Sequence, residues 1–180
     1  MMTRAIKLCR KLSLALRLVS LTLTFFATTV GAQTIDCETD NAALQAMPKS
    51  LVTFTRQDGS EFAVEVKTAK NGLSRAAGFQ RVCESTIKQE PMLFLFEREF
   101  VPKFHMNNVV APLDIAFFTK KGAIKSIQTM QPYVVASLTK PLYGPSVPVL
   151  GALEGHIDFF DEHKLNTKST MRWQALSVSK

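Results

Sequence analysis

The chain has 180 residues, and its 22 basic and 15 acidic residues give it a formal net charge of +7. Five of the basic residues lie within the first 17 positions, where no acidic residue occurs. Without positions 1–32 the chain keeps 17 basic and 15 acidic residues, a net charge of +2, and no cluster of Lys and Arg of the kind that nucleic-acid binding needs stands out in its sequence. The remaining length suits one domain with one hydrophobic core.

The first 32 residues have the pattern of a secretory signal peptide. A basic segment is followed by a short apolar segment at 18–30, and Val30 and Ala32 occupy the small-residue positions before a signal-peptidase cut. The apolar segment is shorter than the roughly 18 residues that a membrane span needs. We therefore expect an exported protein, periplasmic or secreted, that begins at Gln33. The alternative is an uncleaved signal anchor, because Leu12 to Leu16 could lengthen the apolar segment.

Two cysteines, Cys37 and Cys83, remain after signal removal, 46 positions apart. An exported domain meets an oxidising compartment, and an even number of cysteines there favours one disulfide. The alternative is a nucleophilic cysteine held by His105 or His156 as a base. A nucleophile has to stay reduced, so the presence of a second cysteine argues against this alternative.

After an N-terminal arm at residues 33–49, the apolar pattern predicts a mainly β domain at residues 50–180. Apolar and charged residues alternate over 61–67, the period of a half-buried strand, and Asp58-Gly59 predicts the turn before it. Further strands are predicted at 51–56, 91–97, 112–118, 123–130, after 148, and at 171–176. The segments 91–97 and 112–118 are continuously apolar, so both of their faces should be covered.

Two short helices are predicted among these strands. The first covers 71–82 with Asn71 as its N-cap, and the second lies around 158–165, where Phe159 and Phe160 would pack against the sheet. Residues 140–148 hold three prolines and a glycine, which predicts an irregular loop. Short strands dominate, so the fold class is mainly β: a compact single domain, sandwich-like or jelly-roll-like, with two short helices.

Five motifs occur in order along the chain, and they resemble one known family. They are Arg75-x-x-Gly78-Phe79-x-Arg81, Pro91-Met92-Leu93-Phe94-x-Phe96, Phe104-His105-Met106-Asn107-Asn108, Pro112-Leu113-Asp114-Ile115 and Ala152-Leu153-Glu154. Their order and spacing resemble the domain of unknown function 192, a small domain common in exported prokaryotic proteins, over residues 60–172. The resemblance implies a compact β-sandwich or jelly-roll-like fold and no established activity. The family usually has Trp where His105 stands, so the resemblance implies a packing position for His105.

Asp114 is a charged residue within an apolar strand. On a strand it shares one face with Ala116 and Phe118, and the other face is apolar as well. A buried carboxylate has to be paired or hydrogen-bonded, so we expect Arg75 or Arg81 to hold it, with Asn108 as a further donor. Glu154 follows an apolar segment and could share the same arginines.

This cluster can be interpreted in two ways. As a structural cluster it joins a helix to the sheet and needs no ligand. If it lines a cleft, it predicts a site for an anionic or sugar ligand. The candidate ligand-binding residues are Arg75, Arg81, His105, Asn107, Asn108, Asp114 and Glu154.

The functional prediction is a non-catalytic binding or interaction module of the cell envelope, monomeric, with an envelope ligand or protein as its partner. No cofactor or metal is expected, because His156 and His163 lie seven residues apart, two helical turns, too far along a helix to bind one ion. The enzyme alternative is a hydrolase of envelope glycans that uses Asp114 and Glu154 as its acid and base.

Overall fold

The computed structural model describes residues 36–133 and 138–177. The predicted signal peptide at 1–32 lies outside the described residues. Within the described ranges, no helix has the length and apolar composition needed to cross a membrane.

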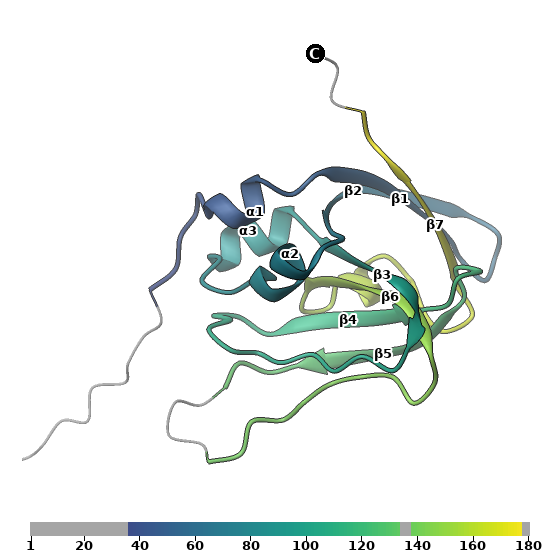
Figure 1. Cartoon of the computed structure of the whole chain (residues 1–180). Helices are drawn as coiled ribbons and strands as arrows, with labels where there is room; N and C mark the ends of the chain where they lie inside the picture. The colour runs from purple at the N-terminus through teal and green to yellow at the C-terminus, as the bar shows by residue number, and fades with distance from the viewer. Residues whose placement is uncertain (1–35, 134–137, 178–180) are drawn as a thin grey trace, which may run out of the picture. The chain divides into compact units, whose positions relative to one another are not determined.

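Seven strands form one mixed sheet in the order β5-β4-β6-β3-β2-β1-β7 (Figure 1). The strands are β1 (Lys49–Thr55), β2 (Glu61–Ala69), β3 (Met92–Phe100), β4 (Leu113–Phe118), β5 (Ile124–Met130), β6 (Val149–His156) and β7 (Thr170–Ala175). β2 and β3 run parallel, and the other neighbouring strands pair antiparallel. The predicted mainly β class is confirmed. The predicted sandwich or jelly-roll arrangement is not, because all seven strands belong to one hydrogen-bonded sheet.

The two edge strands, β5 and β7, meet at one corner of the sheet. Ala123 and Thr170 form an isolated bridge, and the Met171 amide donates to the Gly122 carbonyl at 2.9 Å. Gly122 has φ +78°, and a side chain there would collide with the Met171 carbonyl oxygen. The turn before β5 therefore requires glycine for the sheet to curl until its edges touch.

The sheet carries apolar residues on both faces, and they form two cores. β4 shows the division, because Leu113, Ile115 and Phe117 belong to the first core while Ala116 and Phe118 belong to the second. Every residue of β4 is buried, as the continuous apolar segment predicted. Phe159 and Phe160 of the short helix α4 (Phe159–Glu162) pack into the second core.

Three further short helices lie together beside the sheet: α1 (Ala42–Gln45), α2 (Gly72–Ala77) and α3 (Glu84–Gln89) (Figure 1). α2 begins as predicted, because the Asn71 side chain accepts a hydrogen bond from the Ser74 amide at 2.9 Å in a capping box. The structure has four short helices where two were predicted. The missed helices are α1, with four residues, and α3, with six, and α3 begins after Cys83 without a side-chain cap to mark its start.

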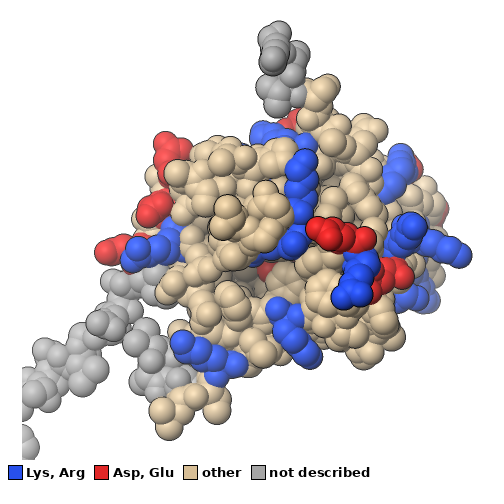
Figure 2. Space-filling view, in the orientation of Figure 1, with Lys and Arg blue, Asp and Glu red and all other residues tan. Residues whose placement is uncertain are grey.

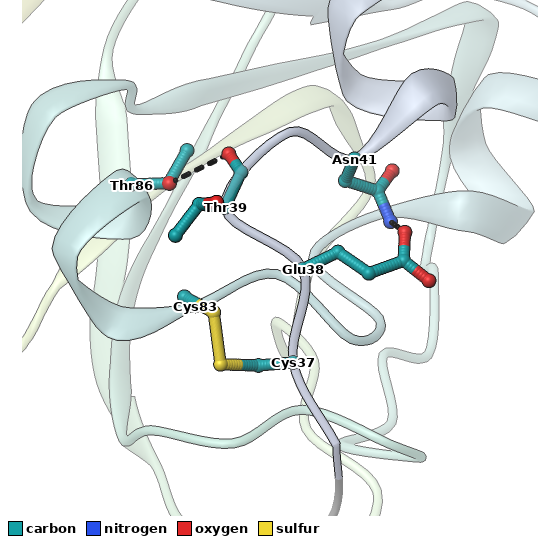
Figure 3. The surroundings of a disulfide bond; sticks show 6 residues. All are labelled: Cys37, Glu38, Thr39, Asn41, Cys83 and Thr86. Atoms are coloured by element: carbon teal, nitrogen blue, oxygen red, sulfur yellow. Dashed lines mark hydrogen bonds between the residues drawn. A yellow bond between two sulfur atoms is a disulfide. The ribbon is translucent and has the colours of Figure 1, made fainter.

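The segment predicted as an arm packs onto the domain. Cys37 and Cys83 form a disulfide with their Cα atoms 4.9 Å apart, and Glu38 bridges to Val82. Figure 3 shows the disulfide and the nearby hydrogen bond from the Thr86 hydroxyl to the Thr39 carbonyl, 3.1 Å long. Leu44 of α1 is fully buried in the first core. The described part of the predicted arm, from residue 36 onward, therefore belongs to the folded unit.

Candidate functional site

A pocket of about 280 Å³ lies between α2 and the loop that follows β3. Its walls are the rings of Phe94, Phe96, Phe100 and Phe104, and the carboxyl group of Glu154 also lines it. We call it the Glu154 pocket. On this face of the domain, Figure 2 shows a hollow with a small acidic area at its base and basic side chains beside its mouth.

The phenylalanine walls are held by contacts between the rings themselves. Phe94 and Phe104 pack edge to face with centroids 5.1 Å apart, and Phe96 and Phe100 do so at 4.7 Å. Phe104 also packs against Phe117 of β4, so the loop after β3 is fastened to the first core. Edge-to-face pairs of this kind add about 0.5–1.5 kcal/mol beyond the buried area, which makes the walls firm.

The turn after α2 supplies another side of the pocket. α2 ends at Gly78, whose φ of +49° lies in the region that favours glycine. Beyond this turn Phe79 is buried in the first core, and Gln80 lines the pocket. Asn108 donates to the Gln80 side chain at 3.1 Å and accepts a backbone hydrogen bond from Arg81 at 2.8 Å. These bonds join the turn to the loop opposite.

Glu154 is the acidic residue among those that line the pocket, and it is only 5% exposed. Its position on β6 pairs it with Met92 of β3 and Ile115 of β4, in the middle of the sheet. Burial alone raises the pKa of this carboxyl to about 8. Across the described ranges 36–133 and 138–177, no donor or cation pairs with it. Glu154 is therefore mainly protonated at neutral pH.

Two cationic side chains line the same pocket nearer to solvent. Arg75 of α2 donates to the backbone carbonyls of Lys70 and Leu95 at 2.8 and 2.9 Å, and its guanidinium lies over the ring of Phe96, 5.7 Å from the centroid. Lys103 is exposed. The pocket thus combines apolar walls, a buried neutral carboxyl and a positively charged mouth.

Asp114 lies on the opposite face of the sheet from Glu154. Asp114 pairs across the strands with Gly155, whereas Glu154 pairs with Ile115, and neighbouring residues of a strand point to opposite faces. The Thr129 hydroxyl donates to the Asp114 carboxyl at 2.7 Å. Burial is the main cause that raises the pKa of Asp114, against the lowering effect of this hydrogen bond.

The predicted arginine–carboxylate cluster does not form. Arg75 reaches backbone carbonyls instead of Asp114, and the Arg81 side chain is exposed. The prediction that one of these arginines holds Asp114 is wrong, because the sheet separates α2 from the face that carries Asp114. Glu154 shares neither arginine.

The structure divides the predicted ligand residues into two groups. Arg75, His105 and Glu154 line the pocket, and Arg81, Asn107, Asn108 and Asp114 do not. His105 is exposed, and its ring nitrogen Nδ1 accepts from the Asn107 amide at 3.4 Å. The motif residues 107 and 108 shape the loop beside the pocket, so their place in the motif does not make them ligand contacts.

Sequence reasoning missed the aromatic walls and Lys103. Phe94 and Phe96 were interpreted only as residues of a core strand, although their spacing already placed both on one face. Phe100 is 41% exposed, and the exposure of a side chain cannot be read from a sequence. In the described part of the chain, no group of three or more histidine, cysteine or acidic side chains could hold a metal ion.

Residues 53–173 match the model of the DUF192 family, described as an uncharacterized ACR. The chain belongs to this family. No curated protein matches it.

Two solved structures share its fold. One, from Sinorhizobium meliloti 1021, is of a protein proposed to be a transcription regulator; it is 19% identical with a TM-score of 0.62, covering 71% of this chain and 95% of that one. The other, from Novosphingobium aromaticivorans, has unknown function; it is 22% identical with a TM-score of 0.58, covering 76% of this chain and 99% of that one. At these identities the likeness shows the DUF192 fold alone.

Proposed function

We propose that this DUF192 protein is an exported, non-catalytic binding module of the cell envelope, periplasmic or secreted, and that its ligand site is the Glu154 pocket. Export is supported by the signal-peptide pattern of residues 1–32 and by a cysteine pair placed for a disulfide. A mature domain from Gln33 onward would then carry the pocket.

The observation that carries the binding role is the unpaired Glu154 carboxyl at the pocket. Buried polar groups in proteins nearly always have a hydrogen-bond partner, and one that lacks a partner needs a specific explanation. The Glu154 oxygens keep a small accessible surface in the pocket, so a ligand that enters the pocket can reach them. A ligand that hydrogen-bonds to Glu154 explains why a carboxyl stands there.

The hydrolase alternative requires Asp114 and Glu154 to act together as acid and base, and their positions do not allow this. Two carboxyl groups that act on one glycosidic bond have to face it together, within about 5–9.5 Å of each other. Asp114 and Glu154 face opposite sides of the sheet. One substrate cannot contact both, so the geometry favours binding over this reaction.

A fragment screen by NMR tests the binding role on the protein isolated after expression of the full chain. We expect small, mainly apolar compounds to shift the methyl signals of Met106 and Val109, which line the pocket. Glu154→Leu should weaken hydrogen-bonding fragments by about 1 kcal/mol, or roughly fivefold. The matched control Glu65→Leu, on the exposed side of β2, should bind like the wild type. A broad library with no compound in the pocket would contradict the proposal.

The export half of the proposal has its own test. The intact mass of the protein recovered outside the cytoplasm should correspond to a chain that begins at Gln33. A full-length product retained in the membrane would show an uncleaved anchor instead.

A further inference from the structure

Resting on the proposed function, we infer that the Glu154 pocket binds a small organic acid. Its apolar body lies between the phenylalanine rings, a hydrogen-bond-accepting group faces Glu154, and its negative charge lies at the mouth beside Arg75 and Lys103.

The walls set the size and the body of the ligand. A volume of about 280 Å³ lies just below the range of about 300–1,000 Å³ that sites for drug-sized molecules occupy, so the ligand has to be small. Phe94, Phe96, Phe100 and Phe104 present apolar surface around this space, and ring faces and edges pack well against another flat ring. The body that fits is a single aromatic ring or an aliphatic group of similar size.

Glu154 sets the chemistry of the buried end. A protonated carboxyl donates one hydrogen bond, and the ligand has to supply the acceptor because no protein group in the described ranges does so. An ammonium group at this position would require the ionised form of Glu154, which burial disfavours by raising its pKa to about 8. A hydroxyl, carbonyl or ether oxygen meets the requirement without ionisation.

Other titratable groups near Glu154 are directed elsewhere. Lys67 of β2 pairs with Met92 of β3, which in turn pairs with Glu154, so the three lie side by side across the sheet. The Lys67 ammonium, however, contacts Gln45 at 3.3 Å and Glu90 at 3.8 Å. His156, two residues further along β6, lies 3.6 Å from Glu162. The titratable and charged groups that line the pocket besides Glu154 are Arg75 from α2 and Lys103 and His105 from the loop after β3.

The mouth sets the charge of the outer end. With Glu154 protonated, Arg75 and Lys103 leave the pocket with a net positive charge. The Arg75 guanidinium uses one nitrogen, Nη1, for the two backbone carbonyls, and its face covers Phe96. A carboxylate at the mouth is attracted by both cations, whereas an ammonium group is repelled.

Three probes with the same ring and matched chain lengths test this inference: 3-(4-hydroxyphenyl)propionate, 4-hydroxyphenethylamine and the neutral 2-(4-hydroxyphenyl)ethanol. Binding is followed by the methyl signals of Met106 and Val109 in the protein purified after expression of the full chain. We expect the acid to bind at least about tenfold more tightly than the amine, with the alcohol between them.

The pH dependence identifies Glu154 as the donor. The affinity of the wild type for the acid should fall about tenfold between pH 7 and pH 9, because only protein with a protonated Glu154 can donate the hydrogen bond to the ligand. Glu154→Gln keeps a donor at every pH, so its affinity should stay constant over this range. Lys103→Gln should weaken the acid about threefold and leave the alcohol unchanged, and the exposed control Lys125→Gln should change neither.

Three results would overturn the inference. Equal or tighter binding of the amine or alcohol in the pocket would remove the organic-acid assignment and leave the binding role intact. If the affinity of Glu154→Gln for the acid falls between pH 7 and pH 9 as it does in the wild type, Glu154 is not the donor. If none of the three probes shifts the Met106 or Val109 signals, the ligand class is wrong, and the broad fragment screen decides separately whether the pocket binds anything.

Discussion

Glu154 and Asp114 both carry buried carboxyl groups on neighbouring strands, but the two carboxyl groups differ in their hydrogen-bond partners. Asp114 has a hydroxyl donor in Thr129, so its polar group is satisfied within the fold. Glu154 has neither a donor nor a cation in the described ranges, and it faces a cavity. Only Glu154 therefore has a free hydrogen-bonding group to offer a ligand.

Glu154 should make the stability of the protein depend on pH. Its pKa rises on folding from 4.5 to about 8, so the folded state holds a proton that the unfolded state has released. The stabilising contribution of the protonated carboxyl is complete below pH 4.5. It is lost as the pH rises from 4.5 through about 8, at about 1.4 kcal/mol per pH unit within this window.

Urea unfolding between pH 5 and pH 9 measures this effect. The free energy of unfolding of the wild type should fall relative to Glu154→Gln up to about pH 8 and run parallel above it. Glu65→Gln, which removes an exposed carboxyl, should track the wild type throughout. If the free energies of unfolding of the wild type and Glu154→Gln already run parallel between pH 5 and pH 8, this carboxyl is not buried as described.

Asp114→Asn should change the free energy of unfolding by less than about 1 kcal/mol at pH 7. Burial disfavours the charged form of Asp114, and the amide oxygen of asparagine can still accept from Thr129. Breaking a buried ion pair would instead cost about 3–5 kcal/mol. Denaturant melts of Asp114→Asn, Arg75→Met and the double variant should show additive changes in the free energy of unfolding. A coupling energy above about 0.5 kcal/mol would show that Arg75 and Asp114 do form an ion pair.

At the scale of elements, strand pairing determines which side chains can act together. β6 lies between β3 and β4, so Glu154 shares a face with residues of both neighbours and with the helices that cover them. α2 and the loop after β3 close over this face and form the pocket. The carboxyl at 114, one residue out of phase, is directed into the second core.

The corner where β5 meets β7 depends on Gly122. Gly122→Ala should lower the free energy of unfolding by more than about 2 kcal/mol, because the new Cβ collides with the Met171 backbone in addition to adopting a positive φ. Gly59→Ala is a matched control, since Gly59 has φ +83° with open space around it and should lose only about 1–2 kcal/mol. Equal losses measured by urea unfolding would show that the edge contact contributes nothing.

At the scale of the whole molecule, the N-terminal segment and the sheet form one unit. The disulfide joins residues 46 positions apart in the sequence, and Leu44 of α1 is buried in the first core. This segment therefore supports the face of the sheet that also carries the Glu154 pocket.

The Cys37–Cys83 disulfide should be formed in the isolated protein and should contribute most to stability at this scale. Thiol labelling of the unfolded, unreduced protein should find no free thiol at positions 37 and 83. Replacing both cysteines with serine should lower the free energy of unfolding by about 4 kcal/mol on the loop-entropy model. Two reactive thiols would refute the disulfide and restore the nucleophile alternative for Cys83.

The local part of the fold was predictable because it depends on neighbouring residues. The strand at 61–67, the continuous apolar segment of β4 and the Asn71 cap of α2 were all readable from the sequence, and the structure confirms them. The predicted alternation of burial holds only as far as Glu65, because Lys67 is buried. The number of short helices and the single sheet were not, because α3 has no side-chain cap to mark its start and strand order is set by long-range packing.

The sequence by itself determined that two carboxyls would be buried, that the domain would be mainly β and that two cysteines could pair. Only the tertiary structure decided that Asp114 accepts from Thr129, that Arg75 bonds to backbone carbonyls and that Glu154 lines an aromatic pocket without a partner among the described residues. The physical reason is that burial follows from local apolar composition, whereas a partner depends on which face of the sheet each side chain occupies and on what the rest of the chain brings to that face.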